Sequence, residues 1–366
     1  MLRSVKIYES CRKQTWRDIF GFADEEQENV LDFSININPV GLSPLGKKKL
    51  LTYLETDILR YPDIKCRSLI KALSLRYNMD ESFISVGNGA TELMYTILRV
   101  LAPDKVYIPA PGFSEYKLSA KSVGIEAVEF PLTKSSGFSV PVSMIISRMK
   151  SHSAIYLGHP NNPDGQCLSE KSFYEIINAA QRNDSIVILD ESFIDFLGDE
   201  WSYRQKCKEY KNLIIITSLT KFYAVPGLRI GCSFSYPEIA CKIKDALIPW
   251  NVNGLAQRYM TYALEDKSYH EETVRYCSEE RIKMLNGLSL IKEIKVCDGT
   301  VNFILCRLNG RFSNAQELQE ALLPFHILIR QCGNYTGLDE SYFRLAIRTD
   351  TENQKLLEAL RKVFHP

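Results

Sequence analysis

The sequence lacks the residue patterns that are typical of a metal site or of a disulfide framework. Its five histidines, at positions 152, 159, 270, 326 and 365, do not have the spacing of metal ligands. Ten cysteines are present, but no two of them form a C-x-x-C pair and several lie in apolar runs. We therefore expect no bound metal, and we predict reduced thiols, as in a cytoplasmic protein, rather than disulfides.

Long apolar runs and an excess of one charge are missing too. No run approaches the length of a membrane span, and residues 1–6 lack the apolar core of a signal peptide. Because both segments are missing, we expect a cytoplasmic protein. Lysine and arginine number 45 against 44 for aspartate and glutamate, so the formal net charge is only +1. Because the charge balance creates no broad field to attract polyanions, we expect a small-molecule partner, no nucleic acid and no membrane.

What is present is a regular alternation of strand and helix patterns. The 366 residues are enough for about two domains. From residue 83 onward, helical patterns alternate with apolar β-type runs, and strands are expected near 83–86, 105–109, 126–130, 153–158, 185–190, 212–217 and 228–234. This alternation predicts an α/β domain whose mostly parallel, seven-stranded sheet lies between helices.

The pattern changes after about residue 250 and predicts a smaller α+β domain, with strands near 301–308, 327–331 and 342–348. Residues 31–39 also alternate as a strand would and run into a turn rich in proline and glycine. We predict three parts: an N-terminal segment (1–44) that joins the small domain, a large ligand-binding domain (45–250) and a small C-terminal domain (251–366).

A lysine follows one of the predicted strands. The run 214–218 has the composition of a buried strand and leads through a short turn to Lys221, with Arg229 eight residues later. A lysine flanked by the Ser218 hydroxyl and a guanidinium suits a ligand that carries an aldehyde and a phosphate, as pyridoxal phosphate does. Burial and nearby cations would lower the pKa of this lysine, which must lose its proton to act as a nucleophile. A surface lysine with a salt-bridged arginine is the alternative.

Polar residues follow two further strands. Asp190 ends the apolar run 186–189, where a buried carboxylate needs a cationic partner such as a protonated pyridine nitrogen. Asn162 lies in the turn 158–165, where its amide can donate to a phenolate oxygen. Taken singly, Asp190 is also compatible with a helix cap or a metal ligand, and Asn162 with a plain turn. Ligands of parallel sheets bind beyond the carboxyl ends of the strands, so we expect these residues to lie near one another.

Two more motifs suit a flat, phosphorylated ligand. A strand enters a glycine turn at 87–89 that opens a helix, and the backbone N–H groups of Gly89 and Ala90 with the Thr91 hydroxyl suit a phosphate. An ordinary turn between strand and helix has the same sequence features. Phe113 follows the strand that ends near residue 109, where its ring could stack on a heterocycle or simply join the core.

In this order and with these neighbours, the residues resemble the fold-type I pyridoxal-phosphate enzymes of the class I/II aminotransferase family, over nearly the whole chain. The resemblance implies the aspartate aminotransferase-like fold and pyridoxal 5'-phosphate as cofactor. It also implies a Schiff base of Lys221, a pyridine contact from Asp190, a phenolic-oxygen contact from Asn162 and stacking by Phe113. The phosphate would be held by Gly89, Ala90, Thr91, Ser218 and Arg229.

The resemblance further implies a homodimer and a substrate subsite. In the family a tyrosine of the partner subunit reaches the phosphate, and Tyr61 in Arg-Tyr-Pro-Asp is similar to it. Arg344 resembles the arginine that binds the substrate α-carboxylate, for which a bidentate guanidinium is suited. Asn38 and Arg330 are further candidates for substrate binding, and Arg330 would take a substrate phosphate. A structural salt bridge is the alternative for Arg344.

Two branches of the family are most similar: threonine-phosphate decarboxylases of cobalamin synthesis and histidinol-phosphate aminotransferases. The decarboxylases are favoured by residues 32–39, 220–229, 249–253 and 327–335. Phe193 also favours them, because aminotransferases usually have a tyrosine at this position that bonds the phenolic oxygen. We predict that its absence makes the Schiff base of Lys221 more basic than in a typical aminotransferase.

One departure weakens this preference. The decarboxylases usually carry a His-Gly-Gly-Asn-like segment near the N-terminus that helps to bind the substrate phosphate, and residues 1–30 contain no histidine. Either the phosphate is held in another way or the substrate is serine phosphate or another anionic amino acid. The sequence leaves transamination of histidinol phosphate with 2-oxoglutarate as the alternative. A more remote alternative is a protein of this fold that binds a ligand without catalysing a reaction. The retention of Lys221 argues against this alternative.

Overall fold

The structure, a computed structural model, describes residues 30–132 and 137–365. Its larger sheet has seven strands in the order β2-β8-β7-β6-β5-β3-β4. They are β2 (Ile84–Gly87), β3 (Lys105–Ala110), β4 (Glu126–Pro131), β5 (Ser153–Gly158), β6 (Ile186–Asp190), β7 (Leu213–Ser218) and β8 (Gly231–Ser235). Only β8 runs antiparallel to its neighbours β2 and β7. The predicted sheet, seven-stranded and mostly parallel, is therefore confirmed.

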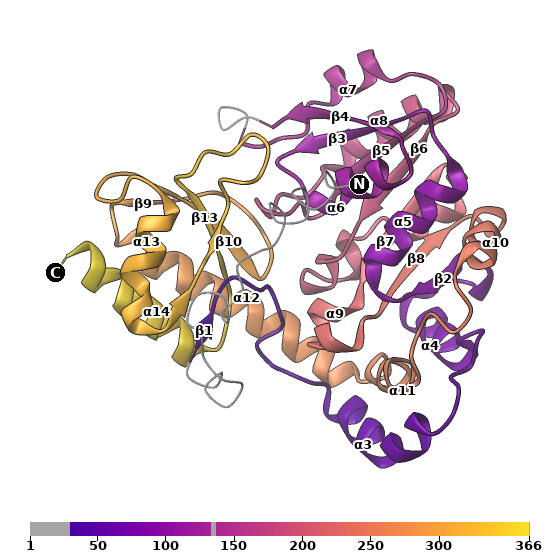
Figure 1. Ribbon diagram of the computed structural model, residues 1–366, viewed down its shortest axis with the longest axis horizontal. Coiled ribbons are helices and arrows are strands. Elements are labelled where there is room, and N and C mark those ends of the chain that lie inside the picture. Colours follow the sequence, from indigo (N-terminus) through magenta and orange to yellow (C-terminus); the bar gives the residue numbers. More distant parts are fainter. Residues whose placement is uncertain (1–29, 133–136, 366) are drawn as a thin grey trace, which may run out of the picture.

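Helices cover both faces of this sheet (Figure 1). Along β6, Val187 and Leu189 enter one apolar cluster while Ile188 enters another, because successive side chains of a strand point to opposite faces. The first cluster includes residues of α4 (Arg67–Tyr77), α8 (Glu170–Arg182) and α11 (Gly254–Ala263). The second includes residues of α5 (Gly89–Leu101), α6 (Ser114–Ser122) and α10 (Pro237–Ala246). Two buried faces explain why these strands read as continuous apolar runs.

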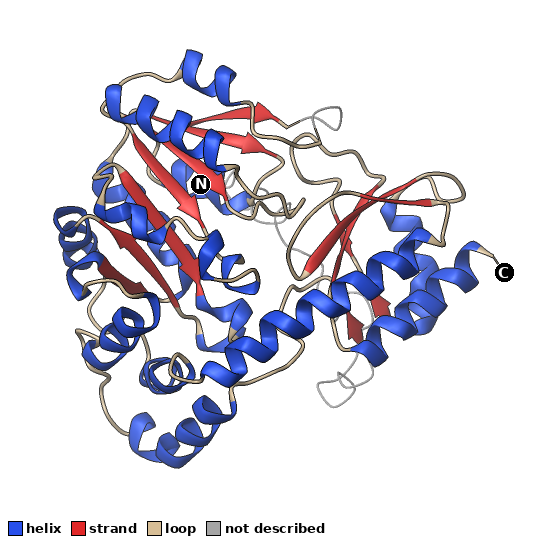
Figure 2. Ribbon diagram, turned by 180° about the vertical axis from the view of Figure 1, so that it is seen from behind, coloured by secondary structure: helices blue, strands red, loops and turns tan. Residues whose placement is uncertain are grey.

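A second sheet has four antiparallel strands in the order β12-β13-β10-β9. They are β9 (Ile294–Val296), β10 (Phe303–Leu308), β12 (Arg330–Gln331) and β13 (Tyr342–Ala346). The apolar cluster beside it includes residues of α12 (Lys267–Ser289), α13 (Ala315–Leu322) and α14 (Asp350–Phe364). Figure 2 shows the long helix α12 running from the larger sheet to the smaller one.

Residues 31–33, which precede α3 (Pro44–Ile58), lie beside this smaller unit. Their strand β1 (Leu31–Asp32) pairs in parallel with β11 (Ile327–Leu328), and the Ala346 N–H donates to the Phe33 carbonyl at 2.9 Å. Helix α7 (Val142–Arg148) lies between β4 and β5 in the sequence. The limits that we predicted for the three parts of the chain stay a prediction.

Three strand predictions are wrong in extent. Of the strand expected over 31–39, only Leu31–Asp32 forms, because the Ser34 backbone N–H donates to the Asp32 carboxylate and the chain bends at residues 34–35. The strand expected from residue 228 begins at Gly231, since Pro226–Leu228 forms a 3-10 turn and Arg229 has a left-handed φ of 55°. The run 327–331 is divided into β11 and β12, which belong to different sheets.

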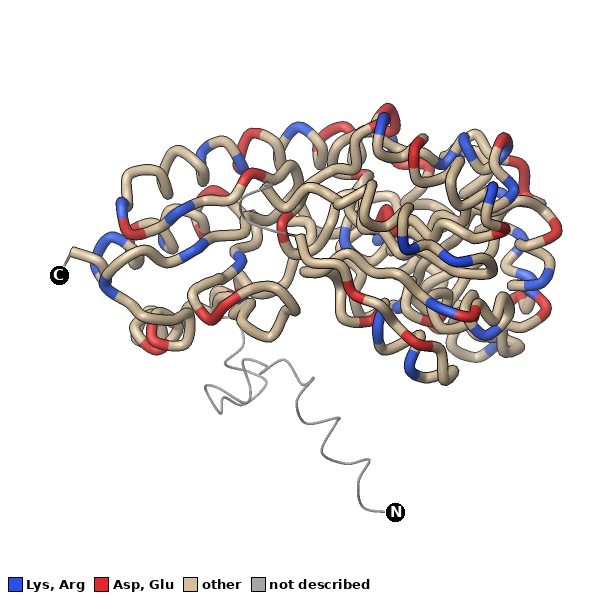
Figure 3. The backbone as a smooth tube through the Cα atoms, turned by 90° about the horizontal axis from the view of Figure 1, so that it is seen from above, with Lys and Arg blue, Asp and Glu red and all other residues tan. Residues whose placement is uncertain are grey.

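Basic and acidic residues are interspersed along the described part of the chain (Figure 3). None of the helices within 30–132 and 137–365 is long and apolar enough to cross a membrane.

Candidate active site

A pocket opens where strands β5, β6 and β7 end. The N-terminus of α5 and the segment after β3 contribute to its wall from the larger sheet, and residues 34–37 and strand β13 close it from the smaller one. Its lining comprises Ser34, Ile35, Asn36, Ile37, Ala90, Thr91, Met94, Phe113, Tyr116, Pro160, Asn162, Asp190, Ser192, Phe193, Ser218, Lys221, Arg229 and Arg344. The expectation that polar residues after separate strands lie near one another therefore agrees with the geometry.

Lys221 lies in the short helix α9 (Leu219–Phe222), directly after β7. Its Nζ donates to the Ser218 hydroxyl oxygen at 2.8 Å, and that oxygen also contacts the Thr220 hydroxyl at 2.8 Å. Burial lowers the pKa of Lys221 to about 8; the cations Arg229 and Arg344 act in the same direction, and Asp190 opposes them. Near neutral pH a tenth or so of such amines is uncharged, which suits a nucleophile.

Asp190 is the last residue of β6 and is only 6% exposed. One carboxylate oxygen, Oδ1, accepts a hydrogen bond from the Ser192 backbone N–H at 2.9 Å. The other, Oδ2, accepts one from the Tyr116 hydroxyl at 2.8 Å. A carboxylate oxygen has two lone pairs, so each still has room for a further donor, such as a protonated ring nitrogen.

The glycine turn between β2 and α5, which we predicted to hold a phosphate, lies close to the Arg229 side chain. Gly89 starts α5 with φ of 83°, and a Cβ at this position would lie 2.6 Å from an Arg229 guanidinium nitrogen. A Cβ on Gly231 would lie 2.5 Å from the Ala90 backbone nitrogen. These two glycines allow the start of β8 to approach the start of α5, so that a guanidinium and a helix N-terminus face the same space. This combination fits a phosphate.

Arg344 is a buried cation surrounded by neutral groups. Its side chain, 3% exposed, donates to the Asn162 amide oxygen and, at 3.0 Å, to the Ser34 carbonyl. The Asn36 amide oxygen, in the orientation that its neighbours require, accepts from the same guanidinium at 3.3 Å. The guanidinium lies 5.2 Å from the ring centre of Phe303. A buried charge with only neutral partners is costly, so this arrangement fits an anionic ligand in the pocket.

Four predicted site residues, Gly89, Asn38, Arg330 and Tyr61, lie outside the lining of this pocket. The Asn38 amide is buried and donates to the Phe222 carbonyl at 2.7 Å, while its backbone N–H donates to the Lys221 carbonyl at 3.0 Å. Asn38 thus supports the lysine loop, and the structure does not place it where it would contact substrate. Arg330 is directly opposite Arg344 in the pairing of β12 with β13 and donates to Asn334 at 2.9 Å.

Tyr61 is 85% exposed and lies against Trp250, with 5.3 Å between ring centres. It does not reach the pocket of its own chain. The roles of all the predicted site residues stay predictions; the structure shows their positions.

Sequence reasoning missed several residues of the pocket. Ser34, Asn36, Met94, Tyr116 and Ser192 line it, but we did not predict any of them as a site residue. The Ser192 hydroxyl oxygen accepts from the Ser218 backbone N–H at 3.1 Å and so joins the loops after β6 and β7. The sequence could have predicted this residue, since Ser192 stands two residues after Asp190 at the end of a buried strand.

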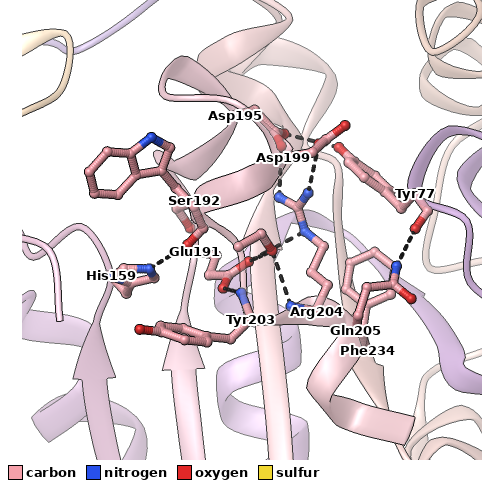
Figure 4. A network of polar contacts seen from close by, with 12 residues as sticks. Tyr77, His159, Glu191, Ser192, Asp195, Asp199, Tyr203, Arg204, Gln205 and Phe234 are labelled. Carbon is pink, nitrogen blue, oxygen red and sulfur yellow. Dashed lines mark hydrogen bonds and ion pairs between the residues drawn. The ribbon is translucent and has the colours of Figure 1, made fainter. Parts of the chain in front are cut away.

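Glu191, the residue after Asp190, belongs to a buried ionic network (Figure 4). Arg204 is 3% exposed and donates to Asp195 at 2.7 Å, and its Nε lies 3.4 Å from a Glu191 carboxylate oxygen. Burial raises the pKa of Glu191 to about 7, against the opposing effect of Arg204. Glu191 also accepts from the Tyr203 backbone N–H at 2.8 Å. Because Glu191 adjoins Asp190, this network anchors the loop that carries Asp190 and Ser192.

Comparison with known proteins identifies the family. The model of the family described as aminotransferase class I and II matches residues 28–360. The chain belongs to this family. A threonine-phosphate decarboxylase of Salmonella typhimurium is 34% identical over 338 residues, which cover 92% of each chain. These findings confirm the predicted family and the prediction of an enzyme that depends on pyridoxal phosphate.

Solved structures of the family confirm the fold. A histidinol-phosphate aminotransferase from Clostridium acetobutylicum has a TM-score of 0.84 and 34% identity, covering 91% of this chain and 99% of its own. An L-threonine-O-3-phosphate decarboxylase from Porphyromonas gingivalis has a TM-score of 0.81 and 27% identity, covering 92% of this chain and 100% of its own. The aspartate aminotransferase-like fold is thus shown, and both predicted branches are represented among the similar proteins.

Proposed function

We propose that this protein is a lyase that removes CO₂ from a phosphorylated amino acid, with L-threonine O-3-phosphate of cobalamin biosynthesis as the first candidate substrate. Similarity to decarboxylases of that name over nearly the full length supports this. The observation that carries the proposal is the pair Arg330 and Arg344, opposite each other on β12 and β13. Opposed residues of an antiparallel pair lie on the same face, so we expect Arg330, which lies outside the lining of the pocket, to take a substrate phosphate beside the carboxylate that Arg344 binds.

The residues present fit pyridoxal phosphate. Asp190 would hold the ring nitrogen, Phe113 the ring face and Asn162 the phenolic oxygen, while Ala90, Thr91, Ser218 and Arg229 would hold the phosphate. When bound to Lys221, the cofactor supplies an electron sink next to the substrate Cα. The protein's part is to keep the ring nitrogen protonated through Asp190 and to orient the substrate through Arg344.

Arg344 and Lys221 decide what happens at the substrate Cα. Arg344 would bind the α-carboxylate with its planar fork and thereby set the direction of the Cα–carboxylate bond. The amine of Lys221, with its pKa of about 8, is able to hold or release a proton at Nζ near neutral pH. Phe193, which has no hydroxyl, lines the pocket and packs edge-to-face on Phe303 at 5.0 Å. This side of the pocket thus lacks the phenol donor that aminotransferases usually have.

Transamination is the second candidate. It is favoured by the similarity to the histidinol-phosphate aminotransferase from Clostridium acetobutylicum, which equals the decarboxylase of Salmonella typhimurium in identity at 34%. In this reaction 2-oxoglutarate would use Arg344 for one of its carboxylates. Glutamate would then be a product.

A homodimer completes the proposal. Several large apolar side chains near Tyr61 are more than half exposed, which is typical of an interaction surface; they are Ile58 (63%), Leu59 (83%) and Ile248 (68%). We expect a second copy to cover them and to receive Tyr61 at its cofactor phosphate. We also place the protein in the cytoplasm, since none of the nine cysteines in the described part of the chain forms a disulfide.

The reaction is tested by product analysis. The protein, loaded with pyridoxal phosphate, is incubated with O-phosphothreonine, O-phosphoserine or histidinol phosphate, each with and without 2-oxoglutarate. CO₂ from a phosphoamino acid without glutamate supports the lyase. Glutamate from histidinol phosphate selects the aminotransferase. Lys221→Ala, treated in the same way, is the control for catalysis that the free cofactor performs.

A further inference from the structure

Tyr116 lines the pocket, although the sequence around it did not predict a site residue. It lies in the first turn of α6, yet its side chain is only 2% exposed. Its ring stacks on that of Tyr156 from β5, with 4.8 Å between ring centres and 4° between planes. Phe113 meets the same ring edge-on, at 5.8 Å and 86°. Two aromatic rings therefore fix the direction in which the Tyr116 hydroxyl points.

That hydroxyl points at the carboxylate of Asp190. The distance from Tyr116 Oη to Asp190 Oδ2 is 2.8 Å. Burial raises the pKa of Tyr116 well above its ordinary value, and the Asp190 charge acts in the same direction. The phenol therefore keeps its proton at neutral pH and is the donor, while the carboxylate is the acceptor. A hydrogen bond to a charged group is stronger than one between neutral groups.

Together with the Ser192 backbone N–H, Tyr116 fixes both oxygens of the carboxylate. The N–H contacts Oδ1 and the phenol contacts Oδ2, so the plane of the carboxylate is set before any ligand binds. A carboxylate that is oriented in advance is what a protonated pyridine nitrogen requires.

We propose that Tyr116 is a positioning residue for the pairing of Asp190 with the cofactor's ring nitrogen. The proposal rests on the proposed function only in that pyridoxal phosphate is the cofactor. It concerns one contact and is independent of whether the substrate is decarboxylated or transaminated. It follows that the Tyr116 hydroxyl strengthens cofactor binding only through the contact between Asp190 and the ring nitrogen. A ligand without that nitrogen should gain nothing from the hydroxyl.

The chain offers a matched control. Tyr156 is the ring on which Tyr116 stacks, it is fully buried as well, and its hydroxyl donates to the Met94 carbonyl at 3.2 Å. Tyr156→Phe therefore removes a buried hydroxyl from the same aromatic pair without touching Asp190. Tyr116→Phe removes the hydroxyl that reaches it.

The experiment measures dissociation constants of two ligands from the cofactor-free protein by fluorescence titration. One ligand is pyridoxal phosphate, and the other is its analogue with C–H in place of the ring nitrogen. We expect Tyr116→Phe to weaken the binding of pyridoxal phosphate about tenfold and that of the analogue less than twofold. Tyr156→Phe should change neither by more than about twofold.

The outcomes separate the possible failures. Equal losses for both ligands in Tyr116→Phe would make the role merely structural and overturn the proposal, as would no loss for either. If Tyr116→Phe does not fold, Tyr116→His replaces it, and the proposal then requires a larger loss for pyridoxal phosphate than for the analogue. Failure of the wild-type protein to bind pyridoxal phosphate at all would instead overturn the proposed function.

Discussion

Replacing Lys221 by methionine should stabilise the cofactor-free protein at neutral pH. Burial lowers the pKa of Lys221 from 10.5 to about 8, so the folded state disfavours the charged amine. At about 1.4 kcal/mol for each factor of ten, this corresponds to about 3.4 kcal/mol at pH 7. The side chain is partly exposed and its hydrogen bond to Ser218 would be lost, which reduces the expected gain to about 2 kcal/mol.

The gain should depend on pH in a defined direction. Between pH 8 and 10.5 the unfolded chain binds a proton at Lys221 that the folded chain does not, so wild-type stability rises with pH in this window. Relative to Lys221→Met, the wild-type deficit should fall from about 2 kcal/mol at pH 7 to about 0.5 kcal/mol at pH 10.

Urea unfolding at both pH values measures this difference. Lys121→Met, on the exposed side of α6, is the control and should stay within about 0.5 kcal/mol of wild type throughout. A constant difference between wild type and Lys221→Met from pH 7 to 10 would refute the reasoning.

Three further predictions concern other parts of the account. Arg344→Lys should lower kcat/KM for the phosphoamino acid about 100- to 1000-fold, whereas Arg348→Lys, which lies outside the pocket, should have a small effect; equal effects would contradict the carboxylate role. Arg204→Met should cost about 3–5 kcal/mol in urea unfolding by leaving two buried carboxylates without their cation, and a loss no greater than that of the exposed Arg182→Met would argue against it. If the proposed homodimer forms, Tyr61→Phe should weaken cofactor binding several-fold, and unchanged affinity would count against a contact with the partner's phosphate.

Sequence reasoning succeeded where a residue of suitable chemistry stands at the end of a predicted strand. Asp190, Ser218 and Lys221 stand at the ends of apolar strands, and parallel strands bring their ends to one edge of a sheet. Residue type and local pattern were therefore sufficient to predict that these side chains share a pocket. Arg344 was expected from the family resemblance, and the structure places it in the same pocket from the other sheet.

It could not give side-chain positions that depend on partners far away in the sequence. Asn38 looked like a substrate ligand, but its amide is occupied by the Phe222 carbonyl and by the hydroxyl groups of Tyr269 and Thr273 on α12. Tyr116 was missed because only the packing of α6 over β5 brings its hydroxyl to Asp190. Neither contact has a local signature.

The central claim is that Lys221 is the residue that bonds to pyridoxal phosphate, and trapping that bond tests it most directly. The protein is incubated with pyridoxal phosphate, reduced with borohydride, digested and analysed by mass spectrometry. We predict one reduced phosphopyridoxyl group per chain, located on Lys221. No label on Lys221 under conditions that label another lysine would contradict the account.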